Sequence, residues 1–220
     1  MMNFALARTN MVNCQLSTNG IIESAVLEAF DSIPREVFLP EKYQNLAYID
    51  EDLKLDNGGM LMEPLILARL VQAAEVKPDD IVLNIGDTTG FSSAVLSRMA
   101  STVVALESKI GILDRARKVW AGMDLCNIAV LKGDNRKGSA QHGPYTLIIL
   151  NGSVSEIPDS LTAQLADSGR LVTVLRKPGQ TVGQITVLKK LNDQGFSTVR
   201  LSDAATPYLQ EFEPVSGFTF

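Results

Sequence analysis

Histidine, cysteine and long hydrophobic runs are scarce in this sequence, and each shortage excludes a class of protein. His142 is the only histidine, which excludes metal sites built from several histidines and weakens any Ser-His-Asp triad. The two cysteines, Cys14 and Cys126, lack CxxC spacing, so we expect small buried side chains in a reducing cytosol rather than a disulfide. No apolar stretch approaches the ~20 residues of a membrane span, and the N-terminus lacks the apolar core of a signal peptide. The sequence therefore predicts a cytoplasmic protein with no metal site and no membrane contact.

Positive charge is also thinly spread. The formal net charge is −5, and no cluster of lysine or arginine is long enough to follow a phosphate backbone, so nucleic acid is not an expected partner. With 220 residues and 45% hydrophobic content, the chain can bury the core of one domain. Nothing in the composition fixes the oligomeric state.

The hydrophobic periodicity changes along the chain. Residues 1–75 read mainly as helices, so we expect a helical N-terminal extension to a core formed by residues 76–220 of a single domain. Pro64 suits the first turn of a helix. From residue 80 onward, predicted strands alternate with predicted helices, which favours an α/β fold with a mostly parallel, doubly wound sheet covered on both faces. We expect strands at 80–85, 102–107, 127–131, 145–150, 170–175, 183–190 and 197–201, and helices at 90–100, 109–122 and 158–167. The last two strands should pair antiparallel, because their connection is too short for a crossover helix.

The most informative segment is the run from Ile81 to Gly90, which reads as a strand, a tight glycine turn and the start of a helix. Such a turn lets the backbone approach a ligand closely and directs helix N–H groups toward it. Glu107 ends the next predicted strand, about 20 residues after Gly86, where an acid commonly binds the hydroxyls of a ribose. On the glycines alone, a structural turn and a nucleotide site remain equally good interpretations.

The glycine spacing bears on which nucleotide could bind. A dinucleotide fingerprint would place glycines where this chain has Thr88 and Phe91, which disfavours a nicotinamide oxidoreductase. The alternative spacing, that of S-adenosylmethionine (SAM) methyltransferases, reads here as Asn84-x-Gly86-x-Thr88-x-Gly90. Two of its four places, Gly86 and Gly90, match. At the other two, Asn84 replaces an acid and Thr88 replaces a glycine.

Several stretches together resemble the protein-L-isoaspartate O-methyltransferase family. They are Met11-Val12-Asn13-x-Gln15, Ile33-Pro34-Arg35-Glu36-x-Phe38-Leu39-Pro40, Ala47-Tyr48-x-Asp50, Val82-Leu83-x-Ile85-Gly86-x-x-x-Gly90-Phe91, Val103-x-x-x-Glu107, Gly133-Asp134, Ile157-Pro158, Gln164-Leu165 and Gly169-Arg170-Leu171-Val172. The resemblance extends from about residue 8 to the C-terminus and implies a Rossmann-like methyltransferase fold. It also implies a protein or peptide methyl acceptor, since the family methylates the carboxylate of abnormal aspartyl residues.

The resemblance further implies roles for individual residues. Gly86 and Gly90 would form the turn beside the methionine part of SAM, with Asn84 and Thr88 at the two altered places. Glu107 would accept from the ribose hydroxyls and Asp134 from the adenine amino group, with Asn135 next to it. Asn151 follows the fourth core strand, where the segment 151–153 could approach the ligand or could equally form a tight turn.

Three departures from the family pattern point toward an altered site. Met62 stands where the family has a serine whose hydroxyl lies close to the reacting carboxylate, and a thioether cannot donate a hydrogen bond. Met62 could simply be packed, or the substrate could be changed or lost; we favour the second interpretation. Asn84 removes a charge, and Thr88 would be strained by ~1–2 kcal/mol if its place requires positive φ.

The leading hypothesis is a SAM-dependent methyltransferase resembling the isoaspartyl family, with no residue assigned as catalytic. The alternative is a noncatalytic relative that binds a protein or a small ligand.

Overall fold

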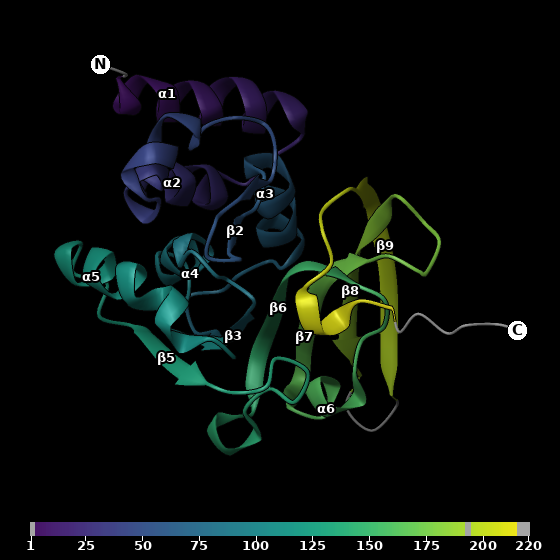
Figure 1. Ribbon diagram of the computed structural model, residues 1–220. Helices are drawn as coiled ribbons and strands as arrows, with labels where there is room; N and C mark the ends of the chain where they lie inside the picture. The colour runs from purple at the N-terminus through teal and green to yellow at the C-terminus, as the bar shows by residue number, and fades with distance from the viewer. Residues whose placement is uncertain (1–2, 192–194, 215–220) are drawn as a thin grey trace, which may run out of the picture.

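A seven-stranded sheet forms the centre of the molecule (Figure 1). The computed structural model describes residues 3–191 and 195–214. The strand order is β5-β4-β3-β6-β7-β8-β9; β3 to β7 run parallel to one another, and β8 and β9 are antiparallel additions at one edge. The strands are β3 (Ile81–Ile85), β4 (Thr102–Glu107), β5 (Ile128–Lys132), β6 (Tyr145–Val154), β7 (Leu165–Leu175), β8 (Gly183–Lys190) and β9 (Phe196–Ala204). This arrangement confirms the predicted mostly parallel sheet and its antiparallel C-terminal pair.

Helices occupy the N-terminal third of the chain and the connections of the sheet. They are α1 (Phe4–Asn10), α2 (Ser24–Ser32), α3 (Pro64–Ala73), α4 (Phe91–Ser97), α5 (Asp114–Gly122) and α6 (Asp159–Thr162). Shorter helical turns are Met11–Leu16, Ser17–Asn19, Arg35–Phe38, Glu41–Leu46, Ile110–Leu113, Ala140–His142 and Gln210–Phe212. A small antiparallel pair, β1 (Leu53–Lys54) and β2 (Met60–Leu61), precedes α3. The predicted helical N-terminus is confirmed, and Pro64 begins α3 as expected.

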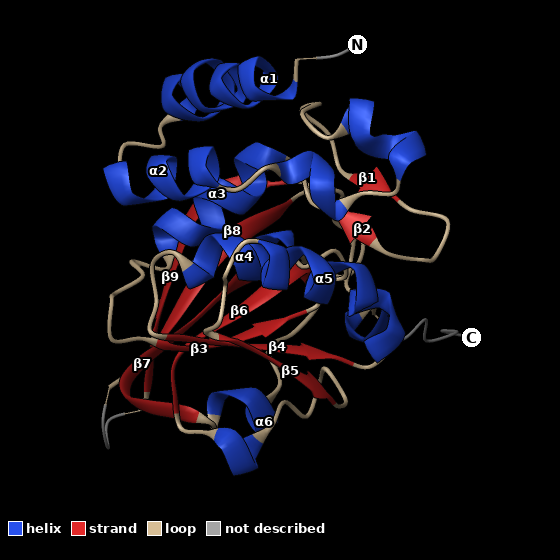
Figure 2. Ribbon diagram, turned by 90° about the vertical axis from the view of Figure 1, so that its left-hand side faces the viewer, coloured by secondary structure: helices blue, strands red, loops and turns tan. Residues whose placement is uncertain are grey.

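The sheet is covered on both faces, as its apolar strands require. In Figure 2, helices α1 to α5 lie on one side of the sheet and α6 lies on the other. Neighbouring residues of β3 point to opposite faces: Val82 packs under the helices, whereas Leu83 and Ile85 join a second core cluster with Leu161 of α6. The same second cluster includes Leu209, from the segment that follows β9.

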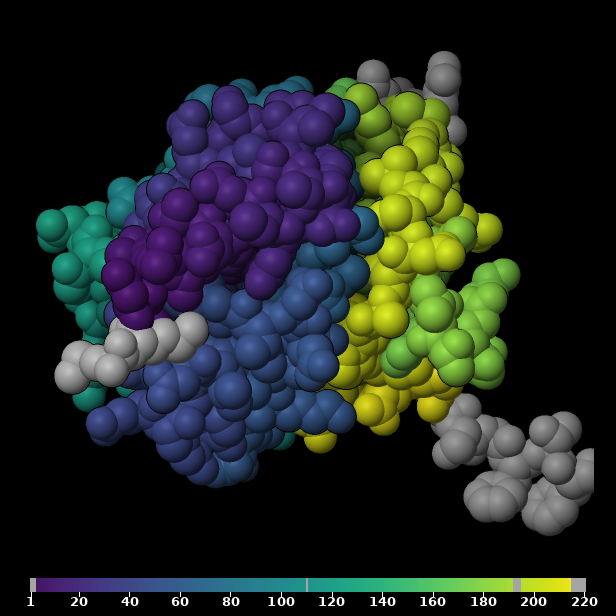
Figure 3. Space-filling model, turned by 90° about the horizontal axis from the view of Figure 1, so that it is seen from above, coloured from purple at the N-terminus to yellow at the C-terminus, as the bar shows by residue number. Residues whose placement is uncertain are grey.

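Phe91, the first residue of α4, connects the N-terminal helices to the sheet. Its ring packs edge-to-face against Phe30 of α2 and against Phe38, with ring centroids 5.8 Å apart in both pairs. Seen from above, the purple and blue N-terminal segments lie over one side of the molecule, beside the yellow C-terminal strands (Figure 3). Because α4 begins at the predicted cofactor turn, the N-terminal segments help to fix the position of that turn.

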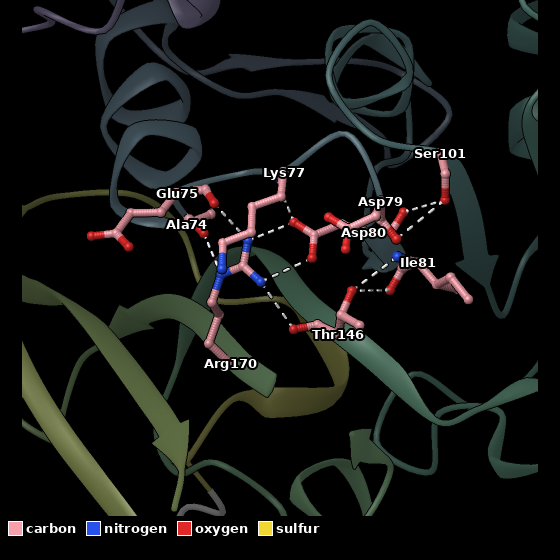
Figure 4. Close-up of polar contacts among 9 residues, drawn as sticks. All are labelled: Ala74, Glu75, Lys77, Asp79, Asp80, Ile81, Ser101, Thr146 and Arg170. Atoms are coloured by element: carbon pink, nitrogen blue, oxygen red, sulfur yellow. Dashed lines mark hydrogen bonds and ion pairs between the residues drawn. The ribbon is translucent and has the colours of Figure 1, made fainter. Parts of the chain in front are cut away.

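A buried ion pair joins four segments near the amino ends of the parallel strands (Figure 4). Arg170 of β7 donates through both terminal nitrogens to Asp80, at 2.6 and 3.0 Å. The same guanidinium also donates to the main-chain oxygens of Ala74, Glu75 and Thr146. Asp80 in turn accepts from the Lys77 N–H at 2.7 Å. This contact therefore ties the end of α3 to the beginnings of β3 and β6.

Both cysteines are exposed free thiols, so the expectation that they are buried is wrong. Neither side chain contributes to the two apolar clusters. Across residues 3–191 and 195–214, no helix has the length and apolar character needed to cross a bilayer. Over the same ranges, no group of three or more His, Cys, Asp or Glu side chains is arranged to hold a metal ion.

Candidate functional site

The turn between β3 and α4 contains the two glycines that the sequence singles out. Gly86 has φ 77° and Gly90 has φ 82°, a backbone region that other residues rarely adopt. A Cβ on Gly90 would lie only 2.2 Å from the Cβ of Ala116, and its carbonyl accepts from Trp120 Nε1 at 3.0 Å. Gly90 thus allows α5 to pack closely, whereas Gly86 faces the carboxyl edge of the sheet.

Asn84 and Asn151 bond each other beneath this turn. Asn151 Nδ2 donates to Asn84 Oδ1 at 2.6 Å and to the Ile85 carbonyl at 2.9 Å. Asn84 Nδ2 then donates to Ser92 Oγ and Ser93 Oγ, each at 2.8 Å. Asn84 is fully buried, so its amide serves the protein's own side chains. The remaining oxygen of this pair, Asn151 Oδ1, is buried without a partner in the described residues.

Asp87 is a buried acid in the turn that the sequence analysis missed. Its carboxylate accepts from the N–H groups of Gly90 at 2.8 Å and Ser93 at 2.7 Å, and from the Ser93 hydroxyl at 2.7 Å. Asp87 thus satisfies N–H groups at the start of α4 from three residues before its N-cap, Gly90. The negative charge that Asn84 lacks therefore reappears three residues later.

Thr88 fits its place without backbone strain. Among the described residues other than glycine, only Glu75, Asp124 and Ser168 have positive φ, so the strain considered for Thr88 does not arise. Its hydroxyl accepts from the Met60 N–H at 2.8 Å and donates to the Met60 carbonyl at 3.1 Å. Thr88 thereby joins the turn to β2.

A cavity of about 330 Å³ opens beside this turn, at the carboxyl ends of β3 and β4. Its lining includes Gly86, Thr88, Glu107, Ser108 and Asn135. Glu107 is buried at the end of β4, where one carboxylate oxygen accepts from the Ser108 hydroxyl at 3.1 Å and the Lys109 N–H at 3.2 Å. A carboxylate offers further lone pairs, so Glu107 retains the capacity to accept from a ligand.

Of the neighbours Asp134 and Asn135, only Asn135 lines the cavity. The Asp134 side chain is 47% exposed, accepts from the Arg136 N–H at 2.9 Å and lies 3.6 Å from Lys137 Nζ. Asn135 is 3% exposed, and its Oδ1 atom has no partner among the described residues. Asn135 therefore contributes to the cavity wall, whereas Asp134 does not.

Met62 is buried at 4% exposure in the main apolar cluster. Together with Gly86, Asp87 and Asn151 it lines a second space of about 10 Å³, which is about the size of one water molecule. The Met62 carbonyl accepts from Arg35, a buried residue whose guanidinium lies 4.9 Å from the Phe91 ring centroid. Burial lowers the pKa of Arg35 to about 9. The Met62 side chain is therefore packed against apolar neighbours, which is the first of the two interpretations of this residue.

Glu63 lies next to Met62 but lines neither of these two spaces. Burial raises the pKa of Glu63 to about 7, and the charges of Asp50 and Asp52 add to the effect. Its N–H donates to Asp52 Oδ1 at 2.8 Å. Glu63 therefore contributes no charge to the wall of either space.

The segment 151–153 is not a tight turn, because β6 continues through it to Val154. Ser153 instead pairs with the chain that follows β9: its N–H donates to the Pro207 carbonyl at 2.8 Å, and its own carbonyl accepts from the Leu209 N–H at 3.0 Å. Residues 207–213, which we call the C-terminal strap, cross the carboxyl edge of the sheet beside the 330 Å³ cavity. No pattern in the sequence predicts this position.

Comparison with known proteins places the chain in a family. The sequence profile of Protein-L-isoaspartate(D-aspartate) O-methyltransferase matches residues 7–206. The chain belongs to this family.

Relatives and solved structures agree with the family assignment. A protein-L-isoaspartate O-methyltransferase of Protochlamydia amoebophila is 40% identical over 162 residues, covering 74% of this chain and 77% of the relative. That of Koribacter versatilis is 35% identical over 175 residues, with 80% and 79% covered. A solved protein-L-isoaspartate O-methyltransferase has TM-score 0.80 at 23% identity; the match covers 92% of this chain and 65% of that one. A putative family member from Plasmodium falciparum, solved with S-adenosyl-L-homocysteine, has TM-score 0.78 at 18% identity, covering 96% of this chain and all of that one. The structural matches establish the shared fold.

Proposed function

We propose that this family member transfers a methyl group from SAM to the carboxylate of an isoaspartyl or D-aspartyl residue in a protein or peptide. The observation that carries the proposal is Glu107, a buried carboxylate at the end of β4 facing a cavity beside the Gly86 turn. A carboxylate there can accept from both hydroxyls of a ribose. The family membership supplies the chemical class of donor and acceptor.

The residues fit the nucleoside part of this cofactor better than its methionine part. The cavity of about 330 Å³ lies at the low end of ligand-pocket volumes, and Asn135 is one of its lining residues. Toward the methionine end the space falls to about 10 Å³. Leu209 lies over Gly86 there, so this end has to open before the whole cofactor can enter.

The proposed methyl transfer requires little of the protein beyond aligning SAM with the acceptor carboxylate. Bound SAM would supply an electrophilic methyl group, which a carboxylate can attack without a general base. The chain's own residues would therefore act mainly by orienting the two reactants. Met62 cannot donate a hydrogen bond to the acceptor, so we expect methylation to be slow compared with a family member that has serine there.

Calorimetry with S-adenosylhomocysteine tests the cofactor assignment. Glu107→Ala should weaken binding about tenfold or more, since hydrogen bonds to a charged group contribute ~1.5–3 kcal/mol. Asp134→Ala serves as the comparison and should lose less, because Asp134 is half exposed and lies outside the cavity wall. Equal affinity of the natural chain and Glu107→Ala would refute the ribose assignment.

Transfer of a labelled methyl group tests the acceptor. We expect slow label transfer to an isoaspartyl peptide and none to the same peptide with an ordinary aspartyl residue. A noncatalytic binding module is the second candidate, favoured by the packed Met62 and the narrow methionine end. Binding of S-adenosylhomocysteine with no transfer to any isoaspartyl peptide would favour that second candidate.

A further inference from the structure

The C-terminal strap lies where the proposed cofactor would have to enter. It begins at Pro207, one residue beyond the end of the family match at Thr206. In Figure 1 this yellow segment passes in front of β6 and β7, near the carboxyl ends of the parallel strands. Ser155 holds its far end, since both the N–H and the hydroxyl of Ser155 donate to the Phe212 carbonyl, at 3.2 and 3.0 Å. On both sides of Leu209 the strap is thus bonded to the end of β6 or to Ser155, the residue that follows it.

Leu209 fills a socket formed by two glycines. A Cβ on Gly86 would lie 2.5 Å from Leu209 Cδ2, and a Cβ on Gly152 would lie 2.8 Å from Leu209 Cγ. The absence of side chains at Gly86 and Gly152 is therefore what admits the leucine, which is 8% exposed. The leucine covers the turn at the place where backbone would meet the methionine part of a cofactor.

Glu211 uses polar partners that a nucleoside would need. One oxygen of its carboxylate accepts from the Ser108 hydroxyl at 2.7 Å, and the other accepts from Asn135 Nδ2 at 2.8 Å. Ser108 and Asn135 both line the 330 Å³ cavity, as does Glu211. The Ser108 hydroxyl is also 3.1 Å from Glu107, yet it has a single proton to donate. Glu107 and Glu211 consequently compete for one donor and repel each other.

We propose that the C-terminal strap is an autoinhibitory closure that competes with the nucleoside cofactor, with Leu209 covering the turn and Glu211 holding the strap shut. This inference rests on the proposed function for the identity of the ligand. Opening withdraws Leu209 from the two glycines and frees Ser108 and Asn135 for the ligand. Because only the open molecules can bind the whole cofactor, the apparent affinity equals the affinity of the open form multiplied by the fraction of molecules that are open.

Removing the Glu211 carboxylate should therefore tighten binding of the nucleoside cofactor. Glu211→Ala loses two hydrogen bonds to a charged group and should bind S-adenosylhomocysteine roughly tenfold more tightly than the natural chain by calorimetry. Glu28→Ala is the control: it removes the same charge from an exposed position on α2, away from the cavity lining. The affinity of this control for S-adenosylhomocysteine should equal that of the natural chain. Glu211→Gln, which keeps the side-chain volume, replaces the alanine variant if that variant does not fold.

Hydrogen exchange provides a readout that is independent of activity. The Leu209 amide is bonded to the Ser153 carbonyl, so it should exchange slowly in the free protein. Adding S-adenosylhomocysteine should speed exchange in residues 207–213, whereas a strap with a merely structural role would stay protected or become slower. Glu211→Ala should speed the same amides without ligand.

The outcomes separate this inference from the proposed function. Tighter binding by Glu211→Ala alone, with faster strap exchange on adding ligand, supports the closure. Equal binding by all three proteins overturns the closure and leaves the cofactor assignment intact. If none of the three proteins binds S-adenosylhomocysteine, both the closure and the cofactor assignment are overturned. The Glu211→Ala variant should have an open cavity that accepts the ligand.

Discussion

Replacing Arg170 with methionine should lower the free energy of unfolding more than the same replacement of an exposed arginine does. The variant leaves Asp80, whose side chain is 3% exposed, without the cation that it pairs with at 2.6 and 3.0 Å. It also removes the donors to the Ala74, Glu75 and Thr146 carbonyls. An aliphatic side chain of similar length keeps much of the packing, so the loss is mainly electrostatic.

The size of the effect follows from leaving a buried charge unpaired. Removing one member of a buried ion pair costs ~3–5 kcal/mol. For a domain of this length each kcal/mol lowers the melting temperature by roughly 2–4 °C, so we expect a fall of about 6–20 °C. The double variant Arg170→Met with Asp80→Leu removes both charges and should recover part of this loss.

Urea unfolding at neutral pH measures these differences, with Arg117→Met as the control. Arg117 is exposed on α5, and its replacement should change the free energy of unfolding by at most ~0.5 kcal/mol. Burial alone would raise the pKa of Asp80, but the hydrogen bonds from Arg170 and the Lys77 N–H outweigh it and lower the pKa. The stabilisation is therefore present above pH ~4 and is lost as pH falls through the lowered pKa, so the gap between the natural chain and Arg170→Met should narrow in acid. A loss below ~1 kcal/mol at pH 7, or a gap that widens in acid, would refute this reasoning.

Three further predictions concern the site and its surroundings. Gly90→Ala should lower the free energy of unfolding by ~2–5 kcal/mol, because its Cβ would clash with Ala116 at positive φ; Gly122→Ala, with nothing within 4 Å, should be neutral in the same urea titration. Glu63→Gln should raise the melting temperature at pH 8 more than at pH 5. The raised pKa of Glu63 means that the native state loses stability as pH rises from about 4.5 through about 7, and glutamine cannot ionise. Met62→Ser should raise the rate of labelled methyl transfer to an isoaspartyl peptide while lowering the free energy of unfolding by ~2–5 kcal/mol, because it empties part of a buried site; an unchanged rate would show that the hydroxyl is not what this chain lacks.

The sequence was sufficient to predict the elements that depend on local pattern. The β-branched run ending at Gly86 and the acid ending the next strand indicated a βα turn with Glu107 at the carboxyl edge, and the structure has both. These features follow from periodicity within about 25 residues, so no tertiary information was needed. The short connection after β8 likewise required an antiparallel partner.

Contacts between distant segments could not be predicted in this way. The bonds from Asn151 to Asn84 span 67 positions, and those from Ser108 to Glu211 span 103. Whether Asp134 or Asn135 faces the cavity depends on the exact path of one loop, which neither residue type dictates. The burial of Met62 depends in the same way on where the N-terminal segments pack.

The course of the strap has a practical consequence for studying this protein. Glu213 lines the cavity, so a label attached to the C-terminal strap lies at the cavity mouth. Helix α1, by contrast, lies on the far side of the helical layer from the sheet (Figure 2). A fluorophore on the strap would thus perturb, or report on, ligand entry, whereas the same group on α1 would leave the cavity untouched.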